Sequence, residues 1–246
     1  MLVIQPSERD APAMLGEWLA AAGAELNLVR PAHSRMPEDL DAYRAVVCLG
    51  GAMSANAVLE YPWLSDVQRV LARAVAARIP VLGVCLGAQL LAVACGGRVA
   101  PGSEGPEVGP ALVAKRDAAW TDPLFAELPL LPDVLQFHRD VVERLPSAAV
   151  VLASSNPYPN QAYRIGDSAY GLQFHIETTT DIVLDWAARA PDVASVASEG
   201  DLSRERLDEL HTDMAETWRP FAQRFVRLAA GDLEPAEPAR TNLPLA

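Results

Sequence analysis

A cysteine between two glycines is the strongest sign of chemistry in the sequence. Residues 81–89 read VLGVCLGAQ, so an apolar segment runs into the pattern G-x-C-x-G around Cys85 and then into a helical pattern. Glycines on both sides permit a sharp strand-to-helix turn, the nucleophile elbow, which presents the central side chain. At a helix N-terminus the macrodipole favours a thiolate, and the free N–H groups, beginning with that of Leu86, can hold a developing oxyanion. A small buried cysteine in an ordinary turn is the alternative interpretation.

A cysteine nucleophile needs a base and a group that orients this base. His175 follows the apolar segment 169–174, and Glu177 comes two residues later. In an extended segment residues i and i+2 point the same way, so Glu177 can hold one ring nitrogen of His175 while the other nitrogen takes the thiol proton. Open α/β sheets bind ligands at the carboxyl ends of their strands. We expect both Cys85 and His175 to lie there.

Other polar residues carry weaker signals. His138 either lines the same pocket or packs within a strand. The apolar neighbours of Cys48 and Cys95 predict inert core thiols, because a buried free cysteine behaves as a small hydrophobe. Four further residues are expected at the surface: His33, His211, Glu104 and Glu107.

The segments that carry these residues alternate between strand and helix patterns. Strands are predicted at 2–4, 24–29, 45–49 and 80–84. Helices are predicted between or after them, at 11–22, 61–78 and 86–95. Repetition of this kind predicts a parallel sheet covered by helices on both faces.

The pattern changes after Gly97. Short strands joined by Pro- and Gly-rich turns are predicted at 108–113, 134–138, 150–153, 161–165 and 169–174. We interpret them as an antiparallel extension of the same sheet. The predicted fold class is therefore α/β, a three-layer sandwich with a mostly parallel central sheet plus an antiparallel extension.

Two helical regions follow these strands. The first is predicted at 180–190. The second, at about 203–230, has apolar residues every three or four positions and contains Pro220, which is expected to kink or split it. A flexible tail is expected for 231–246, which is rich in proline and poor in apolar residues. Residues 1–230 are thus expected to form a single domain.

Composition and charge exclude several classes of protein. The 246 residues include 20 Lys+Arg and 32 Asp+Glu, a net charge of −12, which argues against binding to nucleic acid or to an anionic membrane. The 3 cysteines form no C-x-x-C pair, which excludes a disulfide scaffold and argues against a zinc site. No signal peptide is indicated, and the longest apolar stretch, 80–97, is interrupted by Gln89 and by glycines, unlike a bilayer span. We therefore expect a cytoplasmic protein.

Three separated motifs stand in a characteristic order. They are Gly50-Gly51 within LGGAM, the segment GVCLGAQ around Cys85, and the segment QFHIE that contains His175 and Glu177. Together they resemble the class I (triad) glutamine amidotransferases, including the amidotransferase domain of GMP synthase. Segments 137–140 and 161–164 also resemble the stand-alone members, so the resemblance covers roughly residues 45–178. It implies a flavodoxin-like sheet of the class I amidotransferase type.

The resemblance implies a catalytic role for each residue of the triad. Cys85 would attack the side-chain amide of glutamine and form a γ-glutamyl thioester, which water later hydrolyses to glutamate. His175 would protonate the departing ammonia, and Glu177 would orient His175 and stabilise its charged form.

The resemblance also implies substrate-binding residues. The backbone N–H groups of Gly51 and Leu86 would form the oxyanion hole, and Gln89 would contact the substrate glutamine. No cofactor and no metal are expected. An expected partner is a synthetase or acceptor subunit for the ammonia, because the amidotransferase fold accounts for nearly the whole chain; the oligomeric state stays open.

Two alternatives remain at this point. The same Cys-His-Glu triad would serve a hydrolase of γ-glutamyl peptides or conjugates, with an amine in place of ammonia as the leaving group. A non-catalytic regulatory module that retains the pocket is the other alternative. One departure from the family pattern is Ile176, which stands where proline is usual after the active-site histidine; it makes the local turn less rigid but removes no catalytic group.

Overall fold

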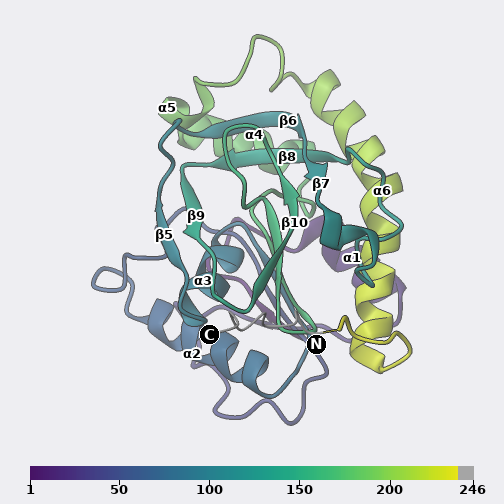
Figure 1. Cartoon of the computed structure of the whole chain (residues 1–246). Helices are drawn as coiled ribbons and strands as arrows, with labels where there is room; N and C mark the ends of the chain where they lie inside the picture. Colours follow the sequence, from purple (N-terminus) through teal and green to yellow (C-terminus); the bar gives the residue numbers. More distant parts are fainter. Residues whose placement is uncertain (238–246) are drawn as a thin grey trace, which may run out of the picture.

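An eight-stranded sheet forms the centre of the molecule (Figure 1). The structure is a computed structural model and describes residues 1–237. In spatial order the strands are β2 (Asn27–Val29), β1 (Leu2–Ile4), β3 (Val46–Cys48), β4 (Val81–Val84), β12 (Ala169–Leu172), β11 (Ala162–Ile165), β10 (Ala149–Ser154) and β7 (Ala114–Lys115). The first five strands run parallel, and the last three add an antiparallel edge. The predicted fold class is thus confirmed.

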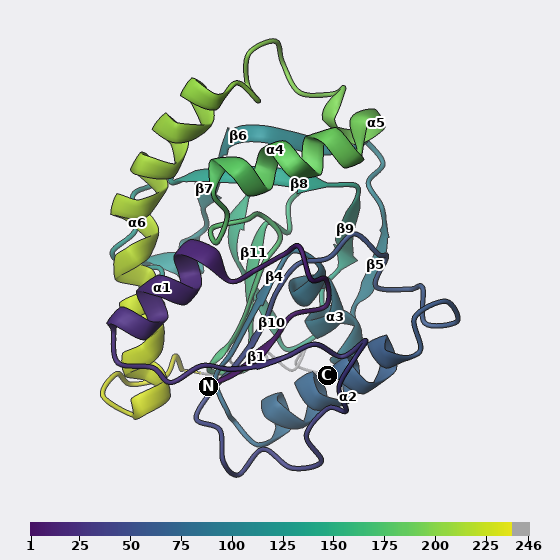
Figure 2. The same cartoon turned by 180° about the vertical axis from the view of Figure 1, so that it is seen from behind.

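Helices cover both faces of this sheet. Helices α1 (Ala13–Ala21) and α6 (Arg204–Ala230) lie on one face, and α2 (Trp63–Ala76) and α3 (Leu86–Ala94) lie on the other (Figure 2). Alternate strand residues supply the two cores: Val3 and Val47 pack on the side of α1 and α6, and Leu2 and Val46 on the side of α2 and α3. Because successive side chains of a strand point to opposite faces, a sheet covered on both sides needs apolar residues throughout.

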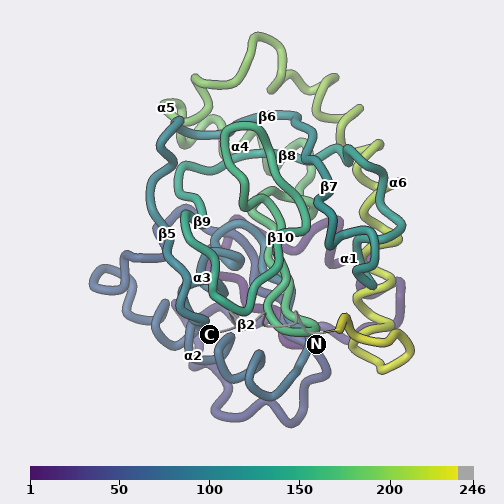
Figure 3. The backbone as a smooth tube through the Cα atoms, in the orientation of Figure 1, coloured from purple at the N-terminus to yellow at the C-terminus, as the bar shows by residue number. Residues whose placement is uncertain are grey.

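Two antiparallel strand pairs stand apart from the main sheet. Strand β6 (Glu107–Leu112) pairs with β8 (Asp133–His138), and β5 (Arg98–Pro101) pairs with β9 (Asp140–Arg144). Figure 3 shows β5 and β9 side by side, although β6 and β8 come between them in the sequence. The expectation that 108–113 and 134–138 extend the main sheet is therefore wrong. Pro110 lacks an N–H for a ladder hydrogen bond, which favours a two-stranded pair over a place inside a sheet.

Helix α6 runs without a break through Pro220, so the expected split does not occur. An internal proline costs about 3 kcal/mol. The side chains of Trp218, Phe221 and Phe225 are buried in the core, and each contributes about 1.5–3 kcal/mol. Burial of this face therefore outweighs the cost of the proline.

Short helices complete the structure. Helices α4 (Thr180–Arg189) and α5 (Pro191–Ala194) lie beside β6 and β8 (Figure 2), and the 3-10 helix η1 (Asp117–Trp120) follows β7. After α6, the Ala236 N–H donates to the Asp167 carbonyl (3.1 Å); residues 238–246 of the expected tail lie outside the described part. Within residues 1–237, none of the helices combines the length and hydrophobicity needed to cross a bilayer.

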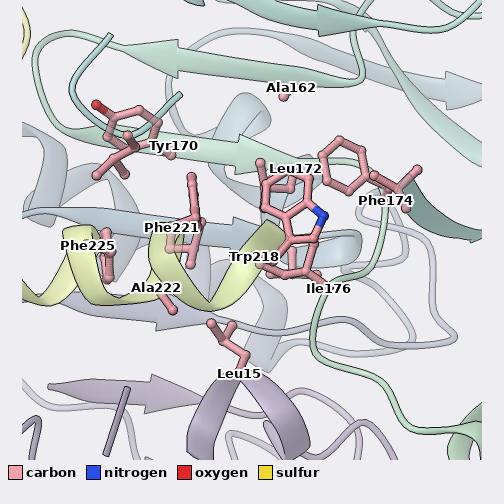
Figure 4. Close-up of a cluster of buried hydrophobic side chains, with 14 of the residues drawn as sticks. Leu15, Ala162, Tyr170, Leu172, Phe174, Ile176, Trp218, Phe221, Ala222 and Phe225 are labelled. Atoms are coloured by element: carbon pink, nitrogen blue, oxygen red, sulfur yellow. The ribbon is translucent and has the colours of Figure 1, made fainter. Parts of the chain in front are cut away.

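A buried cluster supports the segment that follows β12 (Figure 4). Phe174 and Ile176 belong to this cluster, and the Phe174 ring lies 5.2 Å from the ring of Trp218. In an extended segment the alternate residues point the other way. His175 and Glu177 are thus directed away from the core by the packing of their neighbours.

Candidate active site

Cys85 occupies the turn between β4 and α3 in a backbone conformation that is rare for a residue with a side chain. Its φ is 49° and its ψ is −108°; such strain costs about 1–3 kcal/mol and clusters at functional sites. Its N–H donates to the Leu172 carbonyl at the end of β12 (2.7 Å). A Cβ at Gly83 would lie 2.7 Å from backbone atoms of Gly87, and a Cβ at Gly87 would lie 2.0 Å from the carbonyl oxygen of Cys48. Both flanking glycines are therefore required by close backbone packing.

His175 and Glu177 form a buried pair after β12. His175 Nδ1 lies 2.7 Å from Glu177 Oε1, and Glu177 Oε2 accepts the Ile176 N–H (3.0 Å). Burial lowers the pKa of His175, but the charges of Glu177 and Cys85 and the hydrogen bond to Glu177 raise it by more, so that the pKa lies well above its ordinary value of 6.5. The pair therefore favours a charged imidazole.

Cys85 and His175 come together at the carboxyl ends of two neighbouring strands, β4 and β12. A Cβ at Gly50 would lie 3.3 Å from His175 Cε1 and 3.7 Å from Cys85 Cβ, so both side chains border the same small space. Nδ1 of His175 is held by Glu177, and Nε2 has no hydrogen-bond partner within residues 1–237. Nε2 is thus the nitrogen available to the thiol.

Gly51, Leu86 and Gln89 surround the same cysteine. Leu86 begins α3, so its N–H has no acceptor within the helix. A Cβ at Gly51 would lie 2.8 Å from Leu86 Cδ2, which places the glycine loop against the first turn of α3. Gln89, one turn further, is buried and donates from Nε2 to the Asp140 carbonyl (2.8 Å) and to Gln173 Oε1 (3.3 Å).

A cavity of about 500 Å³ opens over these groups. Gly51, Cys85, Gln89 and His175 line it, together with residues of the loop after β1, of the β8–β9 connection and of α4 and α5. Its size is that of small-molecule sites in general. Trp186 of α4 bounds one side, with its ring 4.7 Å from the ring of His175. A deep thiol beside an imidazole and free N–H groups is suited to nucleophilic acyl transfer.

His138, for which two interpretations were open, lines this cavity. Its Nε2 lies 3.1 Å from Glu107 Oε2 and 3.0 Å from Gln136 Oε1, and its Nδ1 has no partner among the described residues. Glu107 is not the surface residue we expected: its side chain is only 13% exposed and accepts hydrogen bonds from Gln161 and Ser155. The pairing of β6 with β8 sets Glu107 opposite His138, a contact that no local pattern signals.

His211 is also buried, and the expectation that it faces solvent is wrong. Its Nε2 lies 2.9 Å from Thr178 Oγ1, and its Nδ1 lies 3.2 Å from Thr180 Oγ1, whose hydroxyl donates to Asp208 (2.5 Å). Burial lowers the pKa of His211. Since Thr178 directly follows Glu177, this chain of hydrogen bonds ties the segment of the buried pair to α6.

Comparison with known proteins gives a consistent picture. The family model for class-I glutamine amidotransferases matches residues 13–181. The chain is 37% identical over 174 residues to a GMP synthase [glutamine-hydrolyzing] of Christiangramia forsetii, a match that covers 68% of the chain but only 32% of that relative. It is 30% identical over 171 residues to γ-glutamyl peptidase 4 of Arabidopsis thaliana, covering 68% of the chain and 67% of the relative.

Solved structures agree at the level of the fold. A glutamine amidotransferase from Thermotoga maritima superimposes with a TM-score of 0.79 and 28% sequence identity, covering 92% of this chain and 96% of that one.

Proposed function

The chain belongs to the class I glutamine amidotransferase family, and on that premise we propose that it hydrolyses the side-chain amide of glutamine through a thioester on Cys85. The observation that carries the proposal is Nε2 of His175, which has no hydrogen-bond partner in the described part of the chain. The ring of His175 borders the same space as Cys85, while Glu177 holds the other ring nitrogen.

The proposed reaction has two acyl-transfer steps. The Cys85 thiolate attacks the amide carbon, and the C–N bond breaks as His175 Nε2 delivers its proton to the leaving nitrogen. Ammonia departs and a γ-glutamyl thioester remains. His175 then takes a proton from water, the resulting hydroxide attacks the thioester carbon, the C–S bond breaks, and glutamate leaves.

The N–H groups of Gly51 and Leu86 are the proposed oxyanion donors. Leu86 N–H is free of helix bonding because it lies in the first turn of α3, and the Gly51 loop packs against that turn. The loss of one such donor typically costs about 10²–10³ in rate. Gln89 is proposed to contact the substrate from the same wall of the cavity.

The fate of the ammonia is a second part of the proposal. The matched region spans about a third of the GMP synthase relative. We propose that the ammonia passes to an acceptor or synthetase subunit, which co-purification with this chain would identify.

Hydrolysis of γ-glutamyl conjugates is the second candidate. Its support is the similarity to γ-glutamyl peptidase 4 over two thirds of that relative. The triad chemistry is the same, and only the leaving group differs.

A direct test is glutamate release from glutamine by the purified chain. Cys85→Ser is expected to abolish release, and Cys95→Ser, a half-buried thiol at the far end of α3, is expected to retain it. Wild-type protein that releases no glutamate from glutamine or from any γ-glutamyl amide, and that no glutamine-like affinity label modifies, would refute the proposal and favour a regulatory module.

A further inference from the structure

Three arginines line the mouth of the cavity from three separate segments. Arg9 comes from the loop after β1, Arg139 from the connection between β8 and β9, and Arg189 from the end of α4. Each side chain is about half exposed, between 52% and 56%. These cations gather at one opening although the whole chain carries a net charge of −12.

Each arginine is held in place by an aspartate of α4 or α5. Arg189 Nε lies 2.7 Å from Asp185 Oδ2, Arg9 Nη1 lies 3.6 Å from the same oxygen, and Arg139 pairs with Asp192. Every one of these contacts uses a single nitrogen of the guanidinium. Because arginine carries five N–H donors in a rigid fork that matches a carboxylate, each retains donors for a ligand, and the aspartates limit the entropy lost on binding.

Two aspartates line the same cavity as the arginines. Asp140 lines the same space, but its Oδ2 accepts the hydroxyl of Ser54 (2.6 Å). Asp10 is buried, and burial raises its pKa. At the mouth itself, three arginines stand against their two partners Asp185 and Asp192, which leaves one net positive charge for an approaching anion.

The position of Arg189 indicates which end of a substrate it meets. Trp186 packs against the ring of His175, and Arg189 follows three residues later on α4, which places both on one side of the helix. His175 must protonate the leaving nitrogen, so the leaving group lies on this side. The proposed oxyanion donors are Gly51, in the loop after β3, and Leu86, at the start of the helix after β4, and they pack against each other. They would bind the carbonyl oxygen of the substrate, whereas Arg189 lies on the side of the leaving group.

We propose that Arg9, Arg139 and Arg189 form a carboxylate-binding subsite for the leaving group, so that the preferred substrate is a γ-glutamyl amino acid or peptide. The inference rests on the proposed thioester chemistry at Cys85 and favours the second candidate, the hydrolysis of γ-glutamyl conjugates, in which an amino acid or peptide leaves in place of ammonia. In the reaction of such a substrate, the isopeptide C–N bond breaks, the departing amino group takes the proton from His175, and water converts the thioester to glutamate.

Binding to the Cys85→Ser protein tests the subsite without turnover. Isothermal titration would compare γ-glutamyl-alanine with γ-glutamyl-alaninamide, which differs only in lacking the carboxylate, and with glutamine. We expect the free acid to bind about tenfold more tightly than the amide, since a charge-assisted hydrogen bond contributes about 1.5–3 kcal/mol and partial exposure reduces this. Arg139→Gln and Arg189→Gln, each added to Cys85→Ser, should remove most of the preference.

Arg69→Gln is the matched control, because Arg69 is an aspartate-paired, exposed arginine on α2 (66% exposed) that does not line the cavity, and it should leave the preference intact. Equal binding of acid and amide would overturn the subsite, and so would arginine variants that weaken glutamine as much as γ-glutamyl-alanine, since the arginines would then hold the α-carboxylate of the glutamyl group. Glutamate release by the wild type is measured separately. Turnover without a carboxylate preference would refute only the subsite, whereas absence of turnover on every substrate would refute the proposed function.

Discussion

Replacement of Glu177 by glutamine probes the buried pair most directly. Glu177 Oε1 faces His175 Nδ1 at 2.7 Å, while Oε2 accepts the Ile176 N–H at 3.0 Å. In Glu177→Gln the amide oxygen must take the Ile176 side, because a backbone N–H cannot face an amide NH₂ favourably. The NH₂ group then points at Nδ1, which must become an acceptor, so that the only ring proton sits on Nε2.

The cost follows from this inversion. A hydrogen bond to a charged group contributes about 1.5–3 kcal/mol, which is a factor of about 10–150 in rate. The inverted tautomer adds to this loss, since Nε2 can no longer take the thiol proton; in serine-protease triads the same carboxylate-to-amide change costs about 10⁴ in kcat. We expect Glu177→Gln to lose between about 10² and 10⁴ in kcat, with KM changed little.

The assay is steady-state glutamate release by wild type, Glu177→Gln and Cys85→Ala across a pH series. Cys85→Ala should be the more damaging change, because it removes the nucleophile rather than the group that orients its base. A Glu177→Gln enzyme within about threefold of wild type, or one as inactive as Cys85→Ala, would contradict the role assigned to Glu177.

Three further predictions concern the packing and the buried histidines. Gly87→Ala would place a Cβ 2.0 Å from the Cys48 carbonyl oxygen. We therefore expect it to lower the unfolding free energy by about 3 kcal/mol or more and the melting temperature by about 6–12 °C. In the control Gly96→Ala, φ is +90° but no atom lies within 4 Å of the added Cβ, so the unfolding free energy should fall by only about 1–2 kcal/mol. The pKa of His175 is raised on folding, so the ionised imidazole stabilises the native state fully below pH 6.5 and loses this effect as pH rises through the raised pKa. In urea unfolding, the difference in unfolding free energy between wild type and His175→Gln should therefore shrink with increasing pH. His211→Ala leaves two buried threonine hydroxyls without a ring partner and should cost about 1–3 kcal/mol of unfolding free energy by urea titration.

Each of these predictions has a contrary outcome. Equal melting temperatures for the two alanine variants would show that backbone packing does not require glycine at Gly87. A His175→Gln difference that grows with pH would reverse the inferred direction of its pKa shift. An unchanged unfolding free energy for His211→Ala would show that water replaces the ring.

Local sequence patterns were sufficient to predict the parallel half of the fold and to select the groups proposed to react. The period of two that buries Phe174 and Ile176 directs His175 and Glu177 to the opposite side. Glycines around Cys85 likewise predict the sharp turn between β4 and α3 from steric requirements alone. These features depend on residues close together in the chain, so spacing and side-chain size determine them.

The tertiary structure determined three features that the spacing of residues in the sequence does not predict. The separate pairing of β6 with β8 turned Glu107 inward, α6 buried His211 against the segment after Glu177, and three distant segments brought Arg9, Arg139 and Arg189 to one cavity mouth. Each of these contacts joins residues far apart in the chain, and its formation depends on which faces pack and which strand edges pair. Backbone geometry is determined locally, whereas the partners of a buried polar group are selected by the whole fold that must satisfy it.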